Sequence, residues 1–178
     1  FVCCLSSMNL LHYDEWKDDQ LDPVGILTMF LDAVYSEFIN KAIGTSFMKK
    51  ALVFAMDHRS IGIGALGYHS YLQKNGIPFE SIQARLLNKE MFENIQKASD
   101  KMSACMARSA GTSEFMKGTG YRHSTRRAVA PTTSSSFILG QVSPSIEPLQ
   151  SNYFTKDLAK GKFTYKNPYL KELLSEKG

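Results

Sequence analysis

Residues 128–140 read AVAPTTSSSFILG, and SPSIEP follows at residues 143–148. The first three residues are short and apolar and predict a strand, which Pro131 ends because its ring lacks an N–H and favours extended backbone before it. Five hydroxyl side chains come next, and such side chains cap the N-termini of helices. The apolar residues 137–139 give the predicted helix a side to bury, and Gly140 predicts its end. A strand that leads directly into a hydroxyl-rich helix start indicates an anion-binding site.

The hydroxyl run also carries a resemblance to a known family. A run of serine and threonine is by itself more often a solvated loop. The segment APTTSS at 130–135, together with SIEP at 145–148, nevertheless resembles the substrate-phosphate loop of the large subunit of ribonucleotide reductases. In that family the loop holds the diphosphate of the ribonucleotide. The resemblance therefore implies that the substrate-binding residues are Ala130, Pro131, Thr132, Thr133, Ser134 and Ser135.

The first eleven residues predict a strand and its exit. The segment VCCLSSMNL at 2–10 resembles the strand of the same family that carries one of two redox-active cysteines, and it puts Cys3 on that position. Cys3 is thus the implied catalytic residue. Successive strand residues face opposite ways, so only one of Cys3 and Cys4 can point into an active site, and the sequence leaves open which one. Without the resemblance, both would be read as small buried apolar residues.

Residues 59–67, RSIGIGALG, contain a formal G-x-G-x-x-G pattern. A dinucleotide site needs a strand before the pattern and an acidic residue about 20 positions later. The residues just before it are mostly polar, and Glu80 follows a predicted turn, so this reading is not favoured. The segment running on to residue 72 resembles a strand-to-helix passage of the reductase barrel, in which the glycines allow close packing. His69, in that helix, lacks a second ligand at helical spacing and is expected to pack or be solvated.

Two long helices are expected, and neither is assigned chemistry. Asp22 and Pro23 predict the start of the first. Residues 81–111 predict the second, with a scaffold stripe formed by Ile82, Leu86, Met91, Ile95, Ala98, Met102, Cys105 and Met106. Cys105 is accordingly expected to be an inert buried thiol. A loop with a short helix is expected between residues 43 and 58.

The segment YRHSTRR at residues 121–127 leads into the phosphate loop. Its basic residues could raise the positive potential for an anionic substrate, form a solvated face, or pair with residues outside the chain. A nucleic-acid surface would need interleaved aromatic residues and more length. Further on, residues 152–155 and 162–165 predict a hairpin with its turn at 159–161, and a helix is expected from Pro168.

Bulk properties narrow the class of protein. The 178 residues are 43% hydrophobic with a net charge of +4, which suits anionic small molecules and does not argue for nucleic acid. No apolar run approaches the length of about 20 residues that spans a bilayer, so no membrane is expected. Three cysteines do not form a secreted disulfide framework, so a cytoplasmic chain is expected. The chain opens on Phe1 inside a buried-looking strand, which suggests a fragment.

The resemblance covers three ordered blocks and implies an α/β fold, as a helix-rich part of a ten-stranded α/β barrel. Residues 1–178 are expected to form a single fragment, with barrel strands and helices in 1–150 and a hairpin with the start of a C-terminal helix in 151–178. The implied function is part of a ribonucleoside-diphosphate reductase large subunit, an oxidoreductase that acts by thiyl-radical chemistry. The family's Asn-x-Cys-x-Glu pattern, which holds the thiyl cysteine, does not occur here, so the chain alone is expected to be inactive.

The resemblance also sets expectations for cofactors and partners. No cofactor or metal is expected on this segment, because the family keeps its radical generator on a separate metal-containing small subunit and uses nucleoside triphosphate effectors. The implied partners are the remainder of the large subunit, the radical-generating small subunit, a ribonucleoside diphosphate and further copies in a homo-oligomer. Two alternatives are a non-catalytic module that binds a phosphate or nucleotide, and a scaffold piece of a split subunit.

Overall fold

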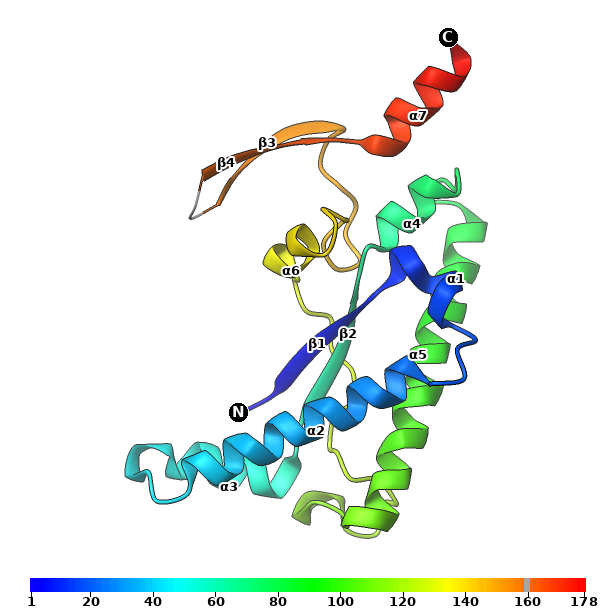
Figure 1. The fold of residues 1–178 in the computed structure, drawn as a ribbon. Coiled ribbons are helices and arrows are strands. Elements are labelled where there is room, and N and C mark those ends of the chain that lie inside the picture. The colour runs from blue at the N-terminus through cyan, green and yellow to red at the C-terminus, as the bar shows by residue number, and fades with distance from the viewer. Residues whose placement is uncertain (159–160) are drawn as a thin grey trace.

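The computed structural model describes residues 1–158 and 161–178 (Figure 1). Its centre is a parallel pair of strands, β1 (Cys4–Asn9) and β2 (Ile61–Leu66), in a register that runs from Cys4 opposite Ile61 to Asn9 opposite Leu66. A separate antiparallel pair, β3 (Tyr153–Leu158) and β4 (Gly161–Lys166), forms the predicted hairpin. The expected turn at 159–161 includes residues 159 and 160, which lie outside the described residues.

Two parallel strands need a long crossover, and helices supply it. After β1 come a short 3₁₀ turn (Leu10–His12), α1 (Tyr13–Trp16), α2 (Pro23–Ala42), a second 3₁₀ turn (Ser46–Met48) and α3 (Lys49–His58). The predicted start of α2 is confirmed: the Asp22 carboxylate accepts a hydrogen bond from the Gly25 N–H at 3.0 Å, and Pro23 stands at the first helical position. The short helix expected before residue 58 is α3.

Past β2, α4 (Tyr68–Lys74) leads to α5 (Ile82–Ala110), and both predicted ends of α5 are confirmed. The Ser81 hydroxyl accepts from the Ala84 N–H at 3.1 Å, and Gly111 terminates the helix with φ of 79°. Helices α2 and α5 pack together and cover one face of the β1–β2 pair, as Figure 1 shows. The core under them is formed by Leu31, Tyr35, Ile61, Ile63, Met91 and Ile95, among others.

The predicted apolar stripe of α5 is only partly right. Met91 and Ile95 are buried, but the buried face continues through the small hydroxyl residues Ser99 and Ser103. Cys105 lies two positions beyond Ser103, which turns it about 200° around the helix and leaves it exposed. The expectation of an inert buried thiol at Cys105 is therefore wrong. Ile82, 75% exposed, departs from the stripe for the same reason, since it precedes buried Ala84 by two positions.

An extended segment lies along the other side of β2. The Ile63 N–H donates to the Arg126 carbonyl at 2.9 Å, and the Ala128 N–H donates to the Ile63 carbonyl at 3.2 Å. The strand predicted at 128–130 is not formed. The segment pairs with β2 one residue earlier, through a single parallel bridge between Arg127 and Ile63. The chain then leaves β2 toward Pro131, whose missing N–H could not extend a ladder.

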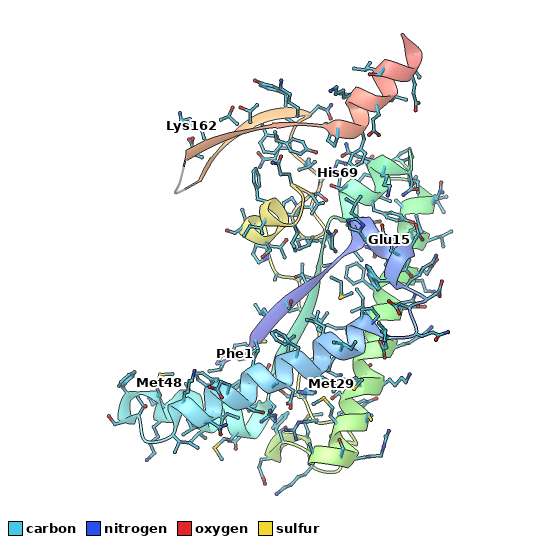
Figure 2. All side chains as sticks on the ribbon, in the orientation of Figure 1. Phe1, Glu15, Met29, Met48, His69 and Lys162 are labelled. Atoms are coloured by element: carbon cyan, nitrogen blue, oxygen red, sulfur yellow. The ribbon has the colours of Figure 1, made fainter. Side chains whose placement is uncertain are left out.

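After α5 come a 3₁₀ turn (Glu114–Met116) and the short helix α6 (Thr133–Ile138). The hairpin and a last helix follow and form the C-terminal part. Beyond the hairpin, α7 (Pro168–Lys177) starts at Asn167, whose side chain accepts from the Tyr169 N–H at 3.0 Å, as Pro168 predicts. Figure 2 labels His69 at the start of α4, on the side where the hairpin lies. Within the described ranges, no helix combines the length and apolar character needed to cross a bilayer.

Candidate functional site

The two faces of the β1–β2 pair differ in character. Cys4 and Met8 point to the helix-covered face and join the core with Ile61 and Ile63. Cys3 belongs to the opposite, glycine side, because a Cβ added to Gly62 would lie 3.6 Å from the Cys3 sulfur. Cys3 therefore faces the side that α2 and α5 do not cover, and Cys4 packs beneath the helices. The redox role of Cys3 stays a prediction.

The glycines of the G-x-G-x-x-G pattern serve close packing. A Cβ on Gly64 would lie 2.6 Å from the carbonyl oxygen of Ala128 and 3.0 Å from the Ser7 hydroxyl. A Cβ on Gly62 would meet the Leu5 side chain at 2.5 Å. Because a Cβ at either position would force its neighbours to shift, the glycines let the segment before the phosphate loop lie against β2. The packing interpretation of the pattern is confirmed.

A pocket of about 310 Å³ lies where β1, the end of β2 and the phosphate loop meet. It is lined by Leu5, Ser6, Ser7, Leu66, Ala130, Thr132, Ser135 and Leu139. Three of the six substrate-binding residues predicted from the resemblance, Ala130, Thr132 and Ser135, thus meet the continuation of the cysteine strand. None of these lining residues is charged, so the pocket offers hydroxyl and backbone groups.

The start of α6 differs from the capping that the sequence predicts. Thr132 stands before the helix in the left-handed region, with φ of 49°, and its side chain caps no helical N–H. Its hydroxyl oxygen instead accepts from the Ser145 N–H at 2.7 Å. This bond joins the APTTSS and SIEP parts of the motif, and it leaves the Thr132 hydroxyl proton available. The Ser145 hydroxyl is buried and has no hydrogen-bond partner among the described residues.

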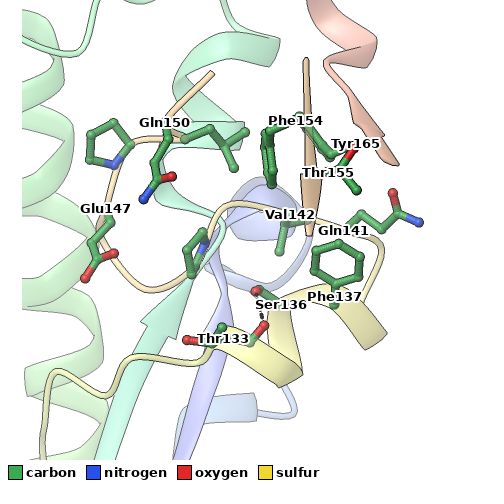
Figure 3. A pocket seen from close by; sticks show the side chains of 13 residues that line it. Thr133, Ser136, Phe137, Gln141, Val142, Glu147, Gln150, Phe154, Thr155 and Tyr165 are labelled. Atoms are coloured by element: carbon green, nitrogen blue, oxygen red, sulfur yellow. Dashed lines mark hydrogen bonds between the residues drawn. The ribbon is translucent and has the colours of Figure 1, made fainter. Parts of the chain in front are cut away.

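A second pocket, of about 320 Å³, lies on the other side of α6 (Figure 3). Thr133, Ser136 and Phe137 line it from α6, and Phe154 and Tyr165 line it from the hairpin, with their ring centroids 5.0 Å apart. Burial raises the pKa of Tyr165 to about 12. The predicted loop residues are therefore divided: Thr133 lines this pocket, whereas neither pocket is lined by Pro131 or Ser134. The substrate-binding roles of all six residues stay predictions.

The segment behind α6 is fastened to the junction of β2 and α4. The Ser143 N–H donates to the Ser70 hydroxyl at 2.8 Å, and the Ser70 N–H donates back to the Ser143 hydroxyl at 3.1 Å. The Leu149 N–H donates to Nδ1 of His69 at 3.1 Å, so His69 serves packing, as expected. No sequence signal distinguishes these two serines from solvated ones. The described part of the chain holds no cluster of residues that could bind a metal ion.

The basic stretch before the loop is paired inside the chain. Oδ1 of Asp32 on α2 accepts from Nε of Arg59 at 2.7 Å, Nε of Arg122 at 3.0 Å and lies 3.0 Å from Nε2 of His123. Burial raises the pKa of Asp32, but hydrogen bonds from His123 and Arg122, together with Arg59, outweigh it and hold that pKa well below its ordinary value. The Ser103 hydroxyl contacts Nδ1 of His123 at 2.9 Å, so α5 holds the other edge of the ring.

Arg126 and Arg127 share a second carboxylate. Both donate to Oδ1 of Asp100 on α5, at 2.5 Å and 2.6 Å. Burial raises the pKa of Asp100, and the two arginines lower it further than burial raises it. The basic stretch is therefore neither a solvated face nor a set of charges awaiting a partner elsewhere, because its arginines pair with two carboxylates inside the chain. Sequence reasoning missed the two aspartates because they lie far from the stretch in the chain.

Comparisons with known proteins agree with this geometry. A family model described as "Ribonucleotide reductase, barrel domain" matches residues 1–119 and 111–178. The ribonucleoside-diphosphate reductase large subunit of Invertebrate iridescent virus 6 is 43% identical over 176 residues, which are 99% of this chain and 18% of that relative. A putative large subunit of Frog virus 3 is 38% identical over 178 residues, covering 99% of this chain and 31% of the relative.

A solved structure shows the same arrangement. The Actinobacillus ureae class Id ribonucleotide reductase alpha subunit matches with a TM-score of 0.91 and 50% sequence identity, over 100% of this chain and 32% of its own. The chain thus spans less than a third of the length of these relatives. The expected α/β fold, a helix-rich part of the reductase barrel, is confirmed. By its sequence and its structure, this chain belongs to the ribonucleotide reductase barrel-domain family.

Proposed function

We propose that this chain is part of a ribonucleoside-diphosphate reductase large subunit, and that it supplies a substrate-phosphate loop and one redox-active cysteine. The observation that carries the proposal is the pocket in which Ala130, Thr132 and Ser135 meet the cysteine strand. Loop and strand are separated by more than a hundred residues in the sequence, and the fold brings them to one cavity. The named relatives support the activity, since they are large subunits of that reductase.

The loop would hold the diphosphate through neutral donors. The Thr132 hydroxyl keeps a free proton because its oxygen already accepts from Ser145, and the Ser135 hydroxyl lines the same pocket. The first N–H groups of α6 have no intrahelical acceptors and would add further donors. Hydrogen bonds from such groups to a charged phosphate are stronger than neutral ones. The donors, rather than the dipole of a helix of six residues, carry this role.

Cys3 would be one member of a thiol pair. As the pair gives two electrons to the substrate, both thiols lose their protons and a disulfide forms between them. The partner of Cys3 would come from outside this chain, because Cys4 points to the opposite face and Cys105 lies exposed on α5. The hydrogen-abstracting cysteine would also come from outside, since the sequence lacks the Asn-x-Cys-x-Glu pattern.

The completing partners are therefore part of the proposal. They are the remainder of the large subunit, a small subunit with a metal-containing radical generator, nucleoside triphosphate effectors and a ribonucleoside diphosphate substrate, in a homo-oligomeric cytoplasmic enzyme. By itself the chain would not reduce ribonucleotides. Mixed with the remaining segments of the large subunit and a small subunit, it would restore turnover. A non-catalytic nucleotide-binding module would instead bind the diphosphate and give no turnover in that mixture.

The loop can be tested by removing single hydroxyls in the reassembled large subunit. Ser135→Ala and Thr132→Val should each weaken cytidine diphosphate binding about tenfold, because hydrogen bonds to charged groups are worth about 1.5–3 kcal/mol. Ser109→Ala is the control, since Ser109 is an exposed serine on α5 that lines neither pocket. Titration calorimetry gives the affinities. Unchanged binding in Ser135→Ala and Thr132→Val together would refute the phosphate role of this pocket.

A further inference from the structure

The face of β1 that the helices leave uncovered carries a row of alternate side chains. A Cβ added to Gly62 would lie 2.5 Å from the Leu5 side chain and 3.6 Å from the Cys3 sulfur. A Cβ added to Gly64 would lie 3.0 Å from the Ser7 hydroxyl. Because alternate residues of a strand point to the same side, Cys3, Leu5 and Ser7 follow one another along this face.

Ser7 stands at the end of this row that meets the phosphate loop. It lines the pocket of about 310 Å³ that Thr132 and Ser135 line from the loop. Ser6 belongs to the same lining, but the alternation of the strand turns its side chain toward the helix-covered face. Residues rise by about 3.3 Å each along a strand, so the backbone of Ser7 lies about 13 Å beyond that of Cys3.

Several hydrogen-bond donors in this pocket have no acceptor. The Ser7 hydroxyl, the Ser135 hydroxyl and the Ala130 N–H make no hydrogen bond to any of the described residues. The Thr132 hydroxyl accepts from Ser145 and keeps its own proton for another acceptor. The Ala130 nitrogen lies 3.6 Å from the Cβ position on Gly64 that the Ser7 hydroxyl approaches, so these two donors flank the same glycine.

Unused donors in a pocket without charged lining residues suit a ligand that is rich in acceptor oxygens. A diphosphate is such a ligand, and hydrogen bonds to its charged oxygens are stronger than bonds between neutral groups. The order of side chains along β1 indicates which part of the substrate each of them meets. The sugar carbon that is reduced must lie near the Cys3 sulfur, and the phosphates extend from that sugar toward the loop, where Ser7 stands.

We propose that Ser7 is a further substrate-binding residue, whose hydroxyl donates a hydrogen bond to the diphosphate from the β1 side of the pocket. Thr132 and Ser135 would hold the same group from the loop side, so that the diphosphate lies between two walls. The inference rests on the substrate function proposed above. It adds to that function a donor from the strand that also carries Cys3, which fixes the distance between the phosphates and the redox thiol.

The test compares the substrate with its two halves in the reassembled large subunit. Titration calorimetry gives the affinity for cytidine diphosphate, and competition gives the affinities for inorganic pyrophosphate, which has no sugar, and for cytidine, which has no phosphate. Ser7→Ala should weaken the binding of cytidine diphosphate and of pyrophosphate by about tenfold and leave cytidine unchanged. Ser7→Thr keeps the hydroxyl and should keep the parent affinities. Ser109→Ala, far from the pocket on α5, is the control.

The fold should tolerate these changes, because the Ser7 side chain bonds to none of the described residues, and thermal midpoints check this. Unchanged binding of cytidine diphosphate in Ser7→Ala would overturn the proposal. So would an equal loss for cytidine and pyrophosphate, which would indicate a distorted pocket, or an equal loss in Ser7→Thr and Ser7→Ala. Failure of the proposed function would appear differently, as unchanged binding in Thr132→Val and Ser135→Ala, whatever Ser7→Ala does.

Discussion

Several long-range polar contacts converge on one residue, Asp32 of α2. Its carboxylate is 8% exposed and faces two arginines and a histidine from two other parts of the chain. Removing one partner of a buried ion pair leaves an uncompensated charge, at a cost of about 3–5 kcal/mol. Asp32→Asn should therefore lower the free energy of unfolding by about 3 kcal/mol or more, measured by urea denaturation.

The matched control lies on the same helix. Glu37 pairs with Lys41 at 3.0 Å, but both side chains are more than 60% exposed. Exposed pairs of this spacing contribute about 0.3–0.5 kcal/mol, so Glu37→Gln should change the unfolding free energy very little. Equal losses in the two variants would mean that burial of the Asp32 cluster does not determine its contribution.

His123 gives this cluster a pH dependence. Burial is the largest effect on its pKa and lowers it; contacts with Asp32 oppose this, and Arg122 and Arg59 lower it further. A histidine whose pKa is lowered by folding binds fewer protons when folded, so stability falls as pH drops through its unfolded pKa of about 6.5. Asp32, whose pKa is also lowered, adds a loss of the same sign below about pH 4.

The free energy of unfolding should therefore fall between pH 7.5 and 5.5, by at most about 1.4 kcal/mol per pH unit for one proton. His123→Gln should flatten this slope without abolishing it, because burial also lowers the pKa of His69. Urea titrations at four pH values measure the parent and the variant, and an identical slope in His123→Gln would refute this account.

Among the elements, β2 depends most on two of its glycines. A Cβ on Gly64 would lie 2.6 Å from the backbone oxygen of Ala128, and a Cβ on Gly62 would lie 2.7 Å from the Cβ of Ala128. Neither of these atoms can rotate away. Overpacking of this kind costs about 1–3 kcal/mol. Gly64→Ala and Gly62→Ala should therefore each lower the free energy of unfolding within that range, in thermal or urea unfolding. Unchanged stability in both variants would contradict the close approach of Ala128.

Helix ends could be predicted from the sequence, whereas strand pairing and the buried face of a helix could not. The caps at Asp22 and Ser81 and the proline at the first position of α7 mark helix starts locally, so those helices were predictable. The segment at 128–130 looks like a strand by composition, but Gly64 sets where the chain can lie against β2, and pairing falls earlier. The prediction that Cys105 is buried rested on helical periodicity alone. Periodicity could not show that the buried face of α5 continues through the small side chains of Ser99 and Ser103.

For the molecule as a whole, the site was predictable only through family resemblance. The proposed roles of the Thr/Ser run and Cys3 come from that resemblance, whereas Ser143, Asp32 and Asp100 gave no signal because their partners are distant in sequence. A local pattern can mark a donor-rich loop, but it cannot show what pairs with its neighbouring charges. That is why the arginines before the loop were open to three interpretations, none of which included pairing with aspartates inside the chain.

The last prediction concerns the open side of the strand pair. Among the described strands, β1 pairs only with β2, so its outer edge presents free backbone groups. Exposed apolar side chains lie on the same side of the molecule or on the loop beside it: Leu5 is 53% exposed, Val129 70% and Leu139 49%. An unpaired edge beside apolar surface recruits other chains, and apolar area left in water forfeits about 25 cal/mol per Å².

The isolated chain should therefore exceed its monomer mass of 20.0 kDa in light scattering at micromolar concentration. Leu5→Lys places a charge on the edge strand and should shift the population toward monomer, whereas Leu174→Lys on α7, at a site 60% exposed, should not. Adding the remainder of the large subunit should compete with self-association and cover the same edge. A monodisperse monomer of the unsubstituted chain would contradict association through the free edge of β1. Equal effects of Leu5→Lys and Leu174→Lys would mean that overall charge, and not this edge, controls the association.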